Sequence, residues 1–257
     1  MSTPIRLMWF VPQPLVVFAG HTPTGTLVHP VDTQSSDEQY NKLVTGEADV
    51  VVTAMDNVIG WNLRPGPKDF RVIAQVERTT PLSLIANPEF GCLLDLRGAN
   101  LLVDALDNGF VVALRAMLKD AGLEQNDYVL KPAGGVIERY KSMLAGSGDA
   151  TLLGDQLTSK AVEAGFVQVA SVQQAYPSFP GQGIVMRMSN TQRDRIGVWL
   201  RELDEARKST QLLDSLQPTD EGIAILTEHR RMLGLPGGED NYTQIVDASL
   251  IYQYLGQ

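Results

Sequence analysis

The sequence has few of the residues that build covalent or metal-held frameworks. A single cysteine, Cys92, excludes an intrachain disulfide framework and a zinc or iron–sulfur site that needs several thiolates. The three histidines form no HExxH motif and none lies near the cysteine, so we expect no metal site. The Walker phosphate-binding pattern is absent, and no GxGxxG pattern opens the first strand–helix unit. We therefore expect no cofactor.

The sequence also lacks an excess of positive charge and long apolar runs. Lys and Arg number 21 and Asp and Glu number 30, a formal net charge of −9. We therefore expect neither nucleic acid nor an anionic membrane surface as a partner. No apolar run reaches the ~20 residues that cross a bilayer, so we expect no membrane insertion. The first residues carry no basic leader with an apolar centre. This predicts a cytoplasmic protein, or a periplasmic one if a leader has been removed.

Short apolar runs alternate with amphipathic segments along most of the 257 residues. Strands that alternate with helices of about 10 residues predict an α/β fold with mainly parallel sheets. The β-branched run at 49–54 predicts a strand covered on both faces. The expected strands are 5–11, 26–32, 49–54, 71–76, 82–86, 100–104, 128–131, 150–153, 166–171 and 183–188. The expected helices are 36–45, 56–63, 110–121, 136–145, 156–164, 190–215, 221–233 and 242–254.

Several segments resemble a known family, in order and at similar spacing. They are Gln39-Tyr-Asn-Lys-Leu43-Val-Thr-Gly46-Glu-Ala-Asp49-Val, Asp95-Leu-Arg-Gly98, Met143-Leu-Ala145-Gly146 with Asp149-Ala150, and Gly165-Phe166. Together they resemble type II periplasmic-binding-protein folds, in the branch that binds sulfonates, nitrate and thiamine precursors. The resemblance covers residues 5–200.

The resemblance implies two lobes that close on a ligand by hinge bending. The first lobe would comprise residues 1–80 and 185–257, and the second would comprise 86–180. The hinges would lie near 77–86 and 181–188, where Glu77 and Arg78 place two charges at a position that is usually apolar in the family.

The resemblance also implies a ligand cleft between the lobes, at the carboxyl ends of the strands, where helix N-termini favour an anion. The residues of this sequence at the matching positions, with Arg78 as a possible clamp for a carboxylate, are the candidate ligand-binding residues. They are Phe10, Pro12, Gln13, Ser35, Ser36, Thr53, Ala54, Asp56, Asn57, Arg78, Asn108, Gly109, Gly134, Gly135, Gly154 and Asp155.

Structural interpretations stand beside these functional ones. Ser36 and Gln39 form a capping-box pattern, so the serines at 35 and 36 could cap a helix with or without facing a ligand. Asp56 and Asp155 each follow an apolar strand, which favours capping of the next helix over ligand contact. Arg78 could instead form a salt bridge, and the glycines could serve only as turns.

The histidines and the cysteine have structural interpretations as well. Cys92, flanked by apolar residues, is predicted to be buried packing. His29 is predicted to be structural within a short strand, and His229 to lie on a polar helix surface. His21 follows the loop after the first strand, which favours a surface residue but also permits a place in the cleft.

Two functions follow. The first, which we favour, is a solute-binding protein of the ABC-transporter type that holds a small organic anion or a polar aromatic acid by lobe closure. Its further partner, if it is secreted, would be a membrane permease complex. The second is a cytoplasmic, cofactor-independent enzyme on the same fold: a decarboxylase, desulfinase or other lyase that acts on an aromatic or cyclic acid. In that case His21 would be the catalytic base.

Overall fold

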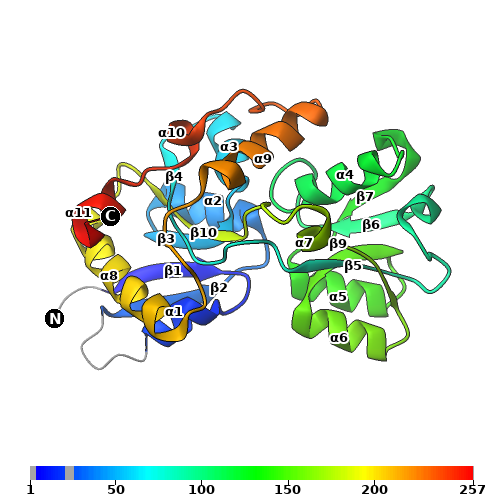
Figure 1. Cartoon of the computed structure of the whole chain (residues 1–257), viewed down its shortest axis with the longest axis horizontal. Helices are drawn as coiled ribbons and strands as arrows, with labels where there is room; N and C mark the ends of the chain where they lie inside the picture. Colours follow the sequence, from blue (N-terminus) through cyan, green and yellow to red (C-terminus); the bar gives the residue numbers. More distant parts are fainter. Residues whose placement is uncertain (1–3, 21–25, 257) are drawn as a thin grey trace.

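The computed structural model describes residues 4–20 and 26–256, which form two sheets lying side by side with helices around them (Figure 1). The chain builds most of the first sheet, passes to the second, and then returns to complete the first.

The first sheet has five strands, and the strand that arrives last in the chain is inserted between two earlier ones. This late strand runs antiparallel to both of its neighbours, whereas the others are parallel. The buried run at 50–54 lies in the middle of the sheet, covered on both faces as predicted. In spatial order the strands are β2 (Val28–Asp32), β1 (Ile5–Trp9), β3 (Val50–Ala54), β10 (Gln182–Arg187) and β4 (Phe70–Gln75).

The second sheet repeats this plan with five strands. Its antiparallel member is the first strand that the chain builds after leaving the first sheet. The prediction of mainly parallel α/β sheets is therefore confirmed for both. In spatial order the strands are β7 (Val129–Pro132), β6 (Asn100–Val103), β8 (Ala150–Gly154), β5 (Leu82–Ala86) and β9 (Val167–Ser171).

Helices flank each sheet, and we call each sheet with its helices a lobe. In the first lobe they are α1 (Pro14–Ala19), α2 (Ser36–Thr45), α3 (Asn57–Leu63), α8 (Arg193–Thr210), α9 (Asp220–Met232), α10 (Tyr242–Ile245) and α11 (Ser249–Leu255). In the second lobe they are α4 (Val111–Asp120), α5 (Val136–Leu144), α6 (Asp155–Glu163) and α7 (Val172–Ala175), with the short 3₁₀ helices η1 (Leu93–Leu96) and η2 (Gln125–Asp127).

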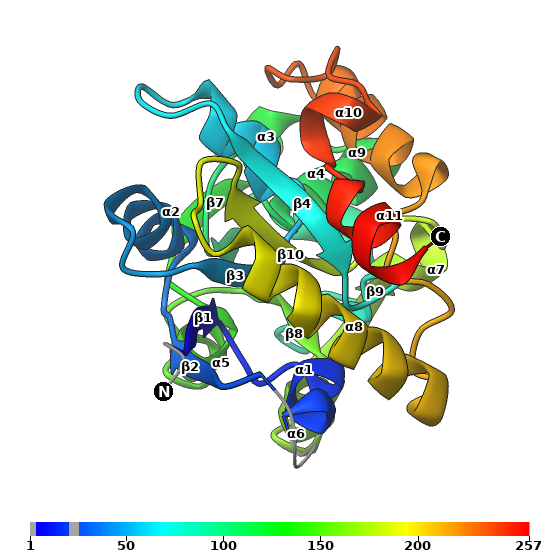
Figure 2. The ribbon, with the colours of Figure 1, turned by 90° about the vertical axis from the view of Figure 1, so that its left-hand side faces the viewer.

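The two faces of the first sheet are covered by different helices. α8 crosses one face with α11 beside it (Figure 2), and the apolar side of α8, which includes Trp199 and Leu203, packs there. α2 and α3 pack against the other face through Tyr40 and Trp61. These two layers fix the sheet whose strand ends form one wall of the site described below.

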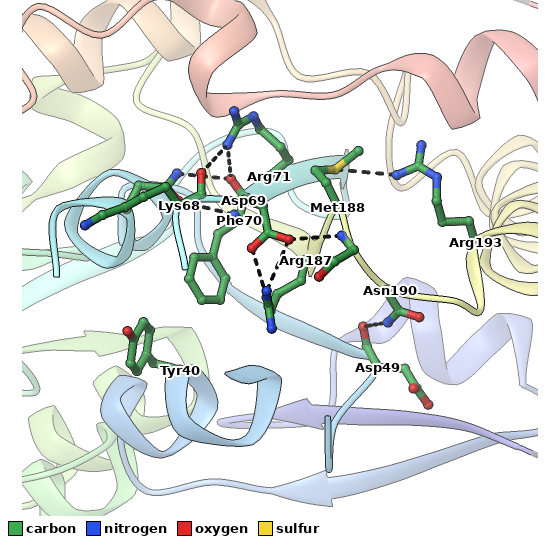
Figure 3. A network of polar contacts seen from close by, with 12 residues as sticks. Tyr40, Asp49, Lys68, Asp69, Phe70, Arg71, Arg187, Met188, Asn190 and Arg193 are labelled. Carbon is green, nitrogen blue, oxygen red and sulfur yellow. Dashed lines mark hydrogen bonds and ion pairs between the residues drawn. The ribbon is translucent and has the colours of Figure 1, made fainter. Parts of the chain in front are cut away.

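The end of β10 is tied to its own lobe by polar contacts (Figure 3). Asp69 accepts a hydrogen bond from the guanidinium of Arg187 at 2.9 Å, and Asn190 donates to the carbonyl of Asp49 at 2.8 Å. These contacts bind β10 and the residues that follow it to the first lobe.

Two short segments connect the sheets. Residues 76–81 lead from β4 to β5, and residues 172–181 lead from β9 to β10. They are bound to each other, since the Thr80 hydroxyl donates to the carbonyl of Pro180 at 2.8 Å and Gly181 donates its N–H to the carbonyl of Arg78 at 3.4 Å. Much of the expected hinge ranges 77–86 and 181–188 lies in β5 and β10, which are sheet strands. The connections that lie outside the sheets are residues 76–81 and 172–181.

The C-terminal part differs from the sequence prediction. The expected helix at 242–254 is two helices, α10 and α11, separated by an extended Val246. Val246 forms a parallel bridge with Val72 of β4, and the next residue donates its N–H to the Val72 carbonyl at 2.9 Å. A tertiary contact with the sheet edge therefore interrupts a helical sequence pattern.

Candidate functional site

A cavity of about 580 Å³ lies between the two lobes. Its walls come from the ends of β1, β3, β6 and β8, from the starts of α3, α4, α5 and α6, and from the connecting segments. Such a volume lies within the range of about 300–1,000 Å³ typical of small-molecule sites. The cavity is therefore placed where the resemblance implied a ligand cleft.

Most of the cavity wall is apolar. The rings of Phe10 and Phe110 come from opposite lobes, and Leu102, Leu114 and Leu157 line the second lobe's side. Burial of a ligand's apolar surface against such walls contributes about 25 cal/mol per Å². The site can therefore hold an organic body as well as a polar group.

Nine of the candidate ligand-binding residues line this cavity. They are Phe10, Pro12, Thr53, Ala54, Asn57, Asn108, Gly109, Gly154 and Asp155. The other seven candidates are not among its wall residues, and each has a different structural position.

Ser35 caps α2 by accepting the N–H of Glu38 at 3.1 Å. The predicted capping box at Ser36 and Gln39 is therefore wrong by one residue. The side chain of Gln39 is buried and donates to the carbonyl of Val52 at 3.1 Å, which binds the helix to β3 instead. The predicted end of the helix is confirmed, because Gly46 takes a left-handed conformation with φ 71°.

Ser36, at the start of α2, faces a carboxylate of the chain itself. Asp104 follows β6 in the second lobe and lines the cavity. Burial raises the pKa of Asp104, and the positive charge of Arg139 and hydrogen bonds from the hydroxyl and backbone N–H of Ser36 oppose that rise. The helix N-terminus expected to receive a ligand anion therefore has a carboxylate of the other lobe beside it.

Asp56 is not a helix cap, so that interpretation is wrong. Its side chain makes no capping hydrogen bond. Its Oδ2 accepts from Arg230 of α9 at 2.8 Å and from the backbone N–H of Gly109, in the second lobe, at 2.9 Å. Burial raises the pKa of Asp56, and Arg230 opposes the rise. Asp155 is not a cap either, since Gly154 occupies the N-cap position of α6 without a side-chain cap bond.

A second polar contact joins the lobes next to Asp56. Asn108 donates its amide hydrogen to Oδ1 of Asn57 at 2.5 Å, and Asn57 donates to the hydroxyl of Thr53 at 2.7 Å. Gly109 has φ +78°, a conformation that L side chains rarely adopt, and a Cβ there would lie 3.1 Å from Oδ1 of Asn57. The glycine therefore permits the close approach of the two lobes at the cavity wall.

The remaining candidates lie outside the cavity wall. Gln13 caps α1 and donates its side-chain amide to the carbonyl of Val76 at 2.7 Å. Gly134 and Gly135 lie close to Gln34 of the first lobe, whose carbonyl would be 3.6 Å and 3.4 Å from an added Cβ. Arg78 forms the salt bridge that was the alternative to a ligand clamp, with Asp214 at 2.8 Å on the exposed surface.

Arg139 is the cation of the cavity, and the sequence interpretation did not include it. It projects from α5, is buried, and donates to the Thr151 hydroxyl (3.0 Å) and to the carbonyls of Gly134 (3.0 Å) and Leu152 (3.2 Å). It forms no ion pair within the described part of the chain. Burial lowers the pKa of Arg139 to about 10, so it remains charged at neutral pH. Two of its five N–H groups have no acceptor among the described residues.

The remaining charges of the cavity are acidic. Glu77 of the first connecting segment accepts from the backbone N–H of Gln182 at 3.2 Å. Burial raises the pKa of Glu77; hydrogen bonds from Gln182 oppose this, and the charge of Asp155 adds to it.

The histidines and the cysteine give mixed outcomes. Cys92 is exposed, so the prediction of buried packing is wrong; it precedes the short helix η1, of which only Leu96 is buried. His229 is also not on a surface: it is 5% exposed, and its ring lies 4.3 Å from that of Tyr176 and 5.6 Å from that of Phe179. His29 lies in the exposed edge strand β2. His21 lies outside the described residues.

Residues 4–20 and 26–256 contain no group of His, Cys, Asp and Glu side chains that could hold a metal ion. Within those ranges, no helix is both long and apolar enough to cross a membrane.

Two sequence signals could have found the missed residues. Arg139 follows Val136 by three residues and precedes Met143 by four, which places a charged side chain on the apolar face of a helix. Asp104 directly follows an apolar strand, the same signal that singled out Asp56 and Asp155. Only the fold shows that these side chains meet in one cavity.

No protein-family model matches the chain, and no curated protein matches it by sequence. Solved structures do match it. The ligand-binding component of an ABC-type import system from Staphylococcus aureus, solved with zinc bound, has a TM-score of 0.79 at 9% identity, over 98% of this chain and 99% of that one. The alkanesulfonate-binding protein of Xanthomonas axonopodis bound to MOPS has a TM-score of 0.64 at 13% identity, over 100% of this chain and 85% of that one.

A third structure extends this comparison to a protein with another ligand. PhnD1 of Prochlorococcus marinus in complex with methylphosphonate has a TM-score of 0.61 at 13% identity, over 90% of this chain and 98% of that one. At such low identities these likenesses concern the fold alone. They confirm the resemblance drawn from the sequence segments: the chain has the two-lobed, type II periplasmic-binding-protein-like fold.

Proposed function

We propose that the chain is a solute-binding protein that holds a small organic anion, such as a polar aromatic acid, between its two lobes. The observation that carries the proposal is Arg139, a buried guanidinium without an ion-pair partner among the described residues, at the wall of a largely apolar cavity. The charge of Asp104 acts on Arg139 without forming an ion pair, so the guanidinium remains costly to bury until a closer counter-charge reaches it. A bound carboxylate or sulfonate supplies that charge, and it can accept two parallel hydrogen bonds from the free N–H groups.

The rest of the cavity favours an organic ligand over an inorganic oxyanion. A bare nitrate or sulfate would leave the rings of Phe10 and Phe110 without contacts. An aromatic body between those rings buries apolar surface on both lobes at once, so it favours the closed arrangement over an open one.

The structural neighbours support a role in import. The Staphylococcus protein is named as the ligand-binding component of an ABC-type import system, and the Xanthomonas protein is named as an alkanesulfonate-binding protein. If this chain has the same role in import, it acts outside the cytoplasmic membrane and passes its ligand to a membrane permease. The alternative, a lyase that uses His21, gains no support from the described residues.

Calorimetric titration with a panel of aromatic and aliphatic carboxylates and sulfonates tests the proposal. We expect at least one aromatic acid to bind and inorganic sulfate and nitrate not to bind. Arg139→Gln should weaken that binding by at least about tenfold, the loss expected for a charge-assisted hydrogen bond. Lys141→Met is the matched control, because it removes an exposed positive charge from the same helix.

Two outcomes would contradict the proposal: no binding to any member of the panel, or equal binding by the wild type and the folded Arg139→Gln variant. Mass spectrometry of the ligand recovered after titration tests the lyase alternative. A changed mass would favour the enzyme, and an unchanged one the binding protein.

A further inference from the structure

The charges of the cavity lie on two different sides of it. Arg139 is bound where β6 and β8 lie side by side: it donates to Thr151 and Leu152 of β8, and the Thr151 hydroxyl donates to the carbonyl of Leu102 in β6 at 2.8 Å. Glu77 lies in the first connecting segment, which follows β4, and the charge of Asp155 at the start of α6 acts on it. Within the described residues Arg139 forms no ion pair with either of these carboxylates, whereas the charge of Asp104 acts on it.

Asp155 lies on the same side as Glu77. It is the first residue of α6 and directly follows Gly154, which pairs with Leu82 at the start of β5. Along β8, Leu152 and Asp155 are three residues apart, a distance on the order of 10 Å in an extended strand. The two ends of the cavity are thus far enough apart to contact different groups of one ligand.

Neither carboxylate has a cationic partner within residues 4–20 and 26–256. Oε2 of Glu77 accepts from Gln182, and its Oε1 accepts no hydrogen bond from a described residue. The side chain of Asp155 forms neither an ion pair nor a hydrogen bond with one. Glu77 is half-buried and Asp155 is exposed, so solvent weakens their mutual repulsion, and a positive group placed between them removes what remains.

We infer that the ligand of this cavity is amphoteric: an organic anion that also carries a protonated amino group. Its anionic group contacts Arg139, its amino group contacts Glu77 and Asp155, and its apolar body fills the space between them. This inference rests on the proposed function and narrows the class of solute. Glu77 and Asp155 then favour this ligand over aromatic acids of the same shape that lack the amino group.

A matched pair of probes tests this inference. 4-(Aminomethyl)benzenesulfonate and 4-methylbenzenesulfonate have the same ring and the same anionic group and differ in the ammonium group at the far end. We expect calorimetric titration of the wild type to show binding of the ammonium compound at least about tenfold tighter, as a charge-assisted hydrogen bond requires.

Variants assign the preference to the two acids. Glu77→Gln combined with Asp155→Asn should reduce the preference to within about threefold and leave the affinity for 4-methylbenzenesulfonate the same or higher, because repulsion of its anionic group is relieved. Glu163→Gln is the matched control, since it removes an acid from the other end of α6. It should leave the preference unchanged.

The outcomes separate this inference from the proposed function. Equal binding of both probes by the wild type, or a preference that survives in the double variant, overturns the amphoteric ligand and leaves the anion-binding protein intact. Failure of both probes, and of the corresponding benzoate pair, also overturns it. The proposed function is then tested separately, by the titration with the panel of carboxylates and sulfonates described above.

Discussion

The carboxylate of Asp56, which follows β3 of the first lobe, accepts the backbone N–H of Gly109 in the second lobe at 2.9 Å. The same oxygen accepts from Arg230, which also donates to the carbonyl of Asp107 at 3.1 Å. α9, which carries Arg230, packs against α4 of the second lobe (Figure 1). The lobes are therefore joined on this side of the cavity by hydrogen bonds from both members of a buried ion pair of the first lobe and by a helix contact.

This ion pair predicts a large and specific loss of stability. Arg230→Met leaves the Asp56 carboxylate buried without a counter-charge, so we expect the free energy of unfolding to fall by about 3–5 kcal/mol. Arg231→Met is the control: Arg231 pairs with Glu239 on the exposed surface, and its loss should cost less than about 1 kcal/mol. Urea denaturation followed by circular dichroism measures both.

The double variant Asp56→Asn, Arg230→Met provides a further check. With the buried charge removed, we expect it to be more stable than Arg230→Met alone, because the uncompensated carboxylate is then absent. If Arg230→Met costs no more than Arg231→Met, the pair does not stabilise the junction between the lobes.

Gly60 predicts an effect on closure that is separate from stability. An added Cβ at this α3 glycine would lie 2.9 Å from the Cβ of Asn108 in the other lobe. Gly60→Ala should therefore hold the lobes apart, even though alanine favours the helix over glycine by about 1 kcal/mol. We expect a larger radius of gyration by small-angle X-ray scattering, weaker binding of the acid found by titration, and an unchanged or higher melting temperature.

A compensating change tests whether the contact with Asn108 is the cause. Asn108→Gly removes the Cβ that the new methyl group would meet, and so the Gly60→Ala, Asn108→Gly variant should recover part of the compact form. A radius of gyration unaffected by Gly60→Ala would show that closure tolerates a side chain at this position.

The fold was largely predictable from the sequence because its signals are local. The central strands, such as β3, are short apolar runs, and the left-handed Gly46 ends α2 where expected. The split between α10 and α11 was not predictable in this way, because the contact that causes it joins Val246 to Val72, far apart in the chain.

The cavity was predictable in position but less so in chemistry. The family resemblance implies a cleft at the carboxyl ends of the strands of both lobes, and on that basis Thr53 and Gly154 were assigned to it. The partners of charged side chains depend on the packing of both lobes. For this reason Asp56 was assigned a local cap although its partner is Arg230, and the role of Arg139 was missed.

The burial of Glu77 predicts that ionisation of its carboxyl group destabilises the folded protein at neutral pH. Burial raises its pKa above the ordinary 4.5, so the folded state binds more protons than the unfolded one between that value and the folded pKa. Stability contributed by protonated Glu77 is present at low pH and is lost as the pH rises through the folded pKa. Glu77→Gln removes this loss, so we expect the variant to melt at a higher temperature than the wild type at pH 7.

The two proteins should become equally stable below about pH 4, where the carboxyl group is protonated in both states. Glu163→Gln, at an exposed position, is the control and should show no such pH-dependent difference. A Glu77→Gln variant that is less stable at pH 7 than at pH 4, relative to the wild type, would contradict the prediction.

His229 predicts a pH dependence of the opposite sign. Its ring lies between Tyr176 and Phe179, next to the second connecting segment, and its Nδ1 has no hydrogen-bond partner in the described part of the chain. Burial lowers the pKa of His229 below 6.5, while the charges of Asp120 on α4 and Glu228 on α9 oppose this.

Because the folded state keeps this imidazole neutral, the unfolded state binds more protons as the pH falls below about 6.5, and stability is lost in that range. We expect His229→Phe, which retains an aromatic ring but cannot be protonated, to lose less of its melting temperature between pH 7 and pH 5 than the wild type. His29→Phe serves as the control, since His29 lies in an exposed strand. Identical pH profiles for the wild type and His229→Phe would mean that protonation of this histidine does not limit the stability of the junction between α9 and the second connecting segment.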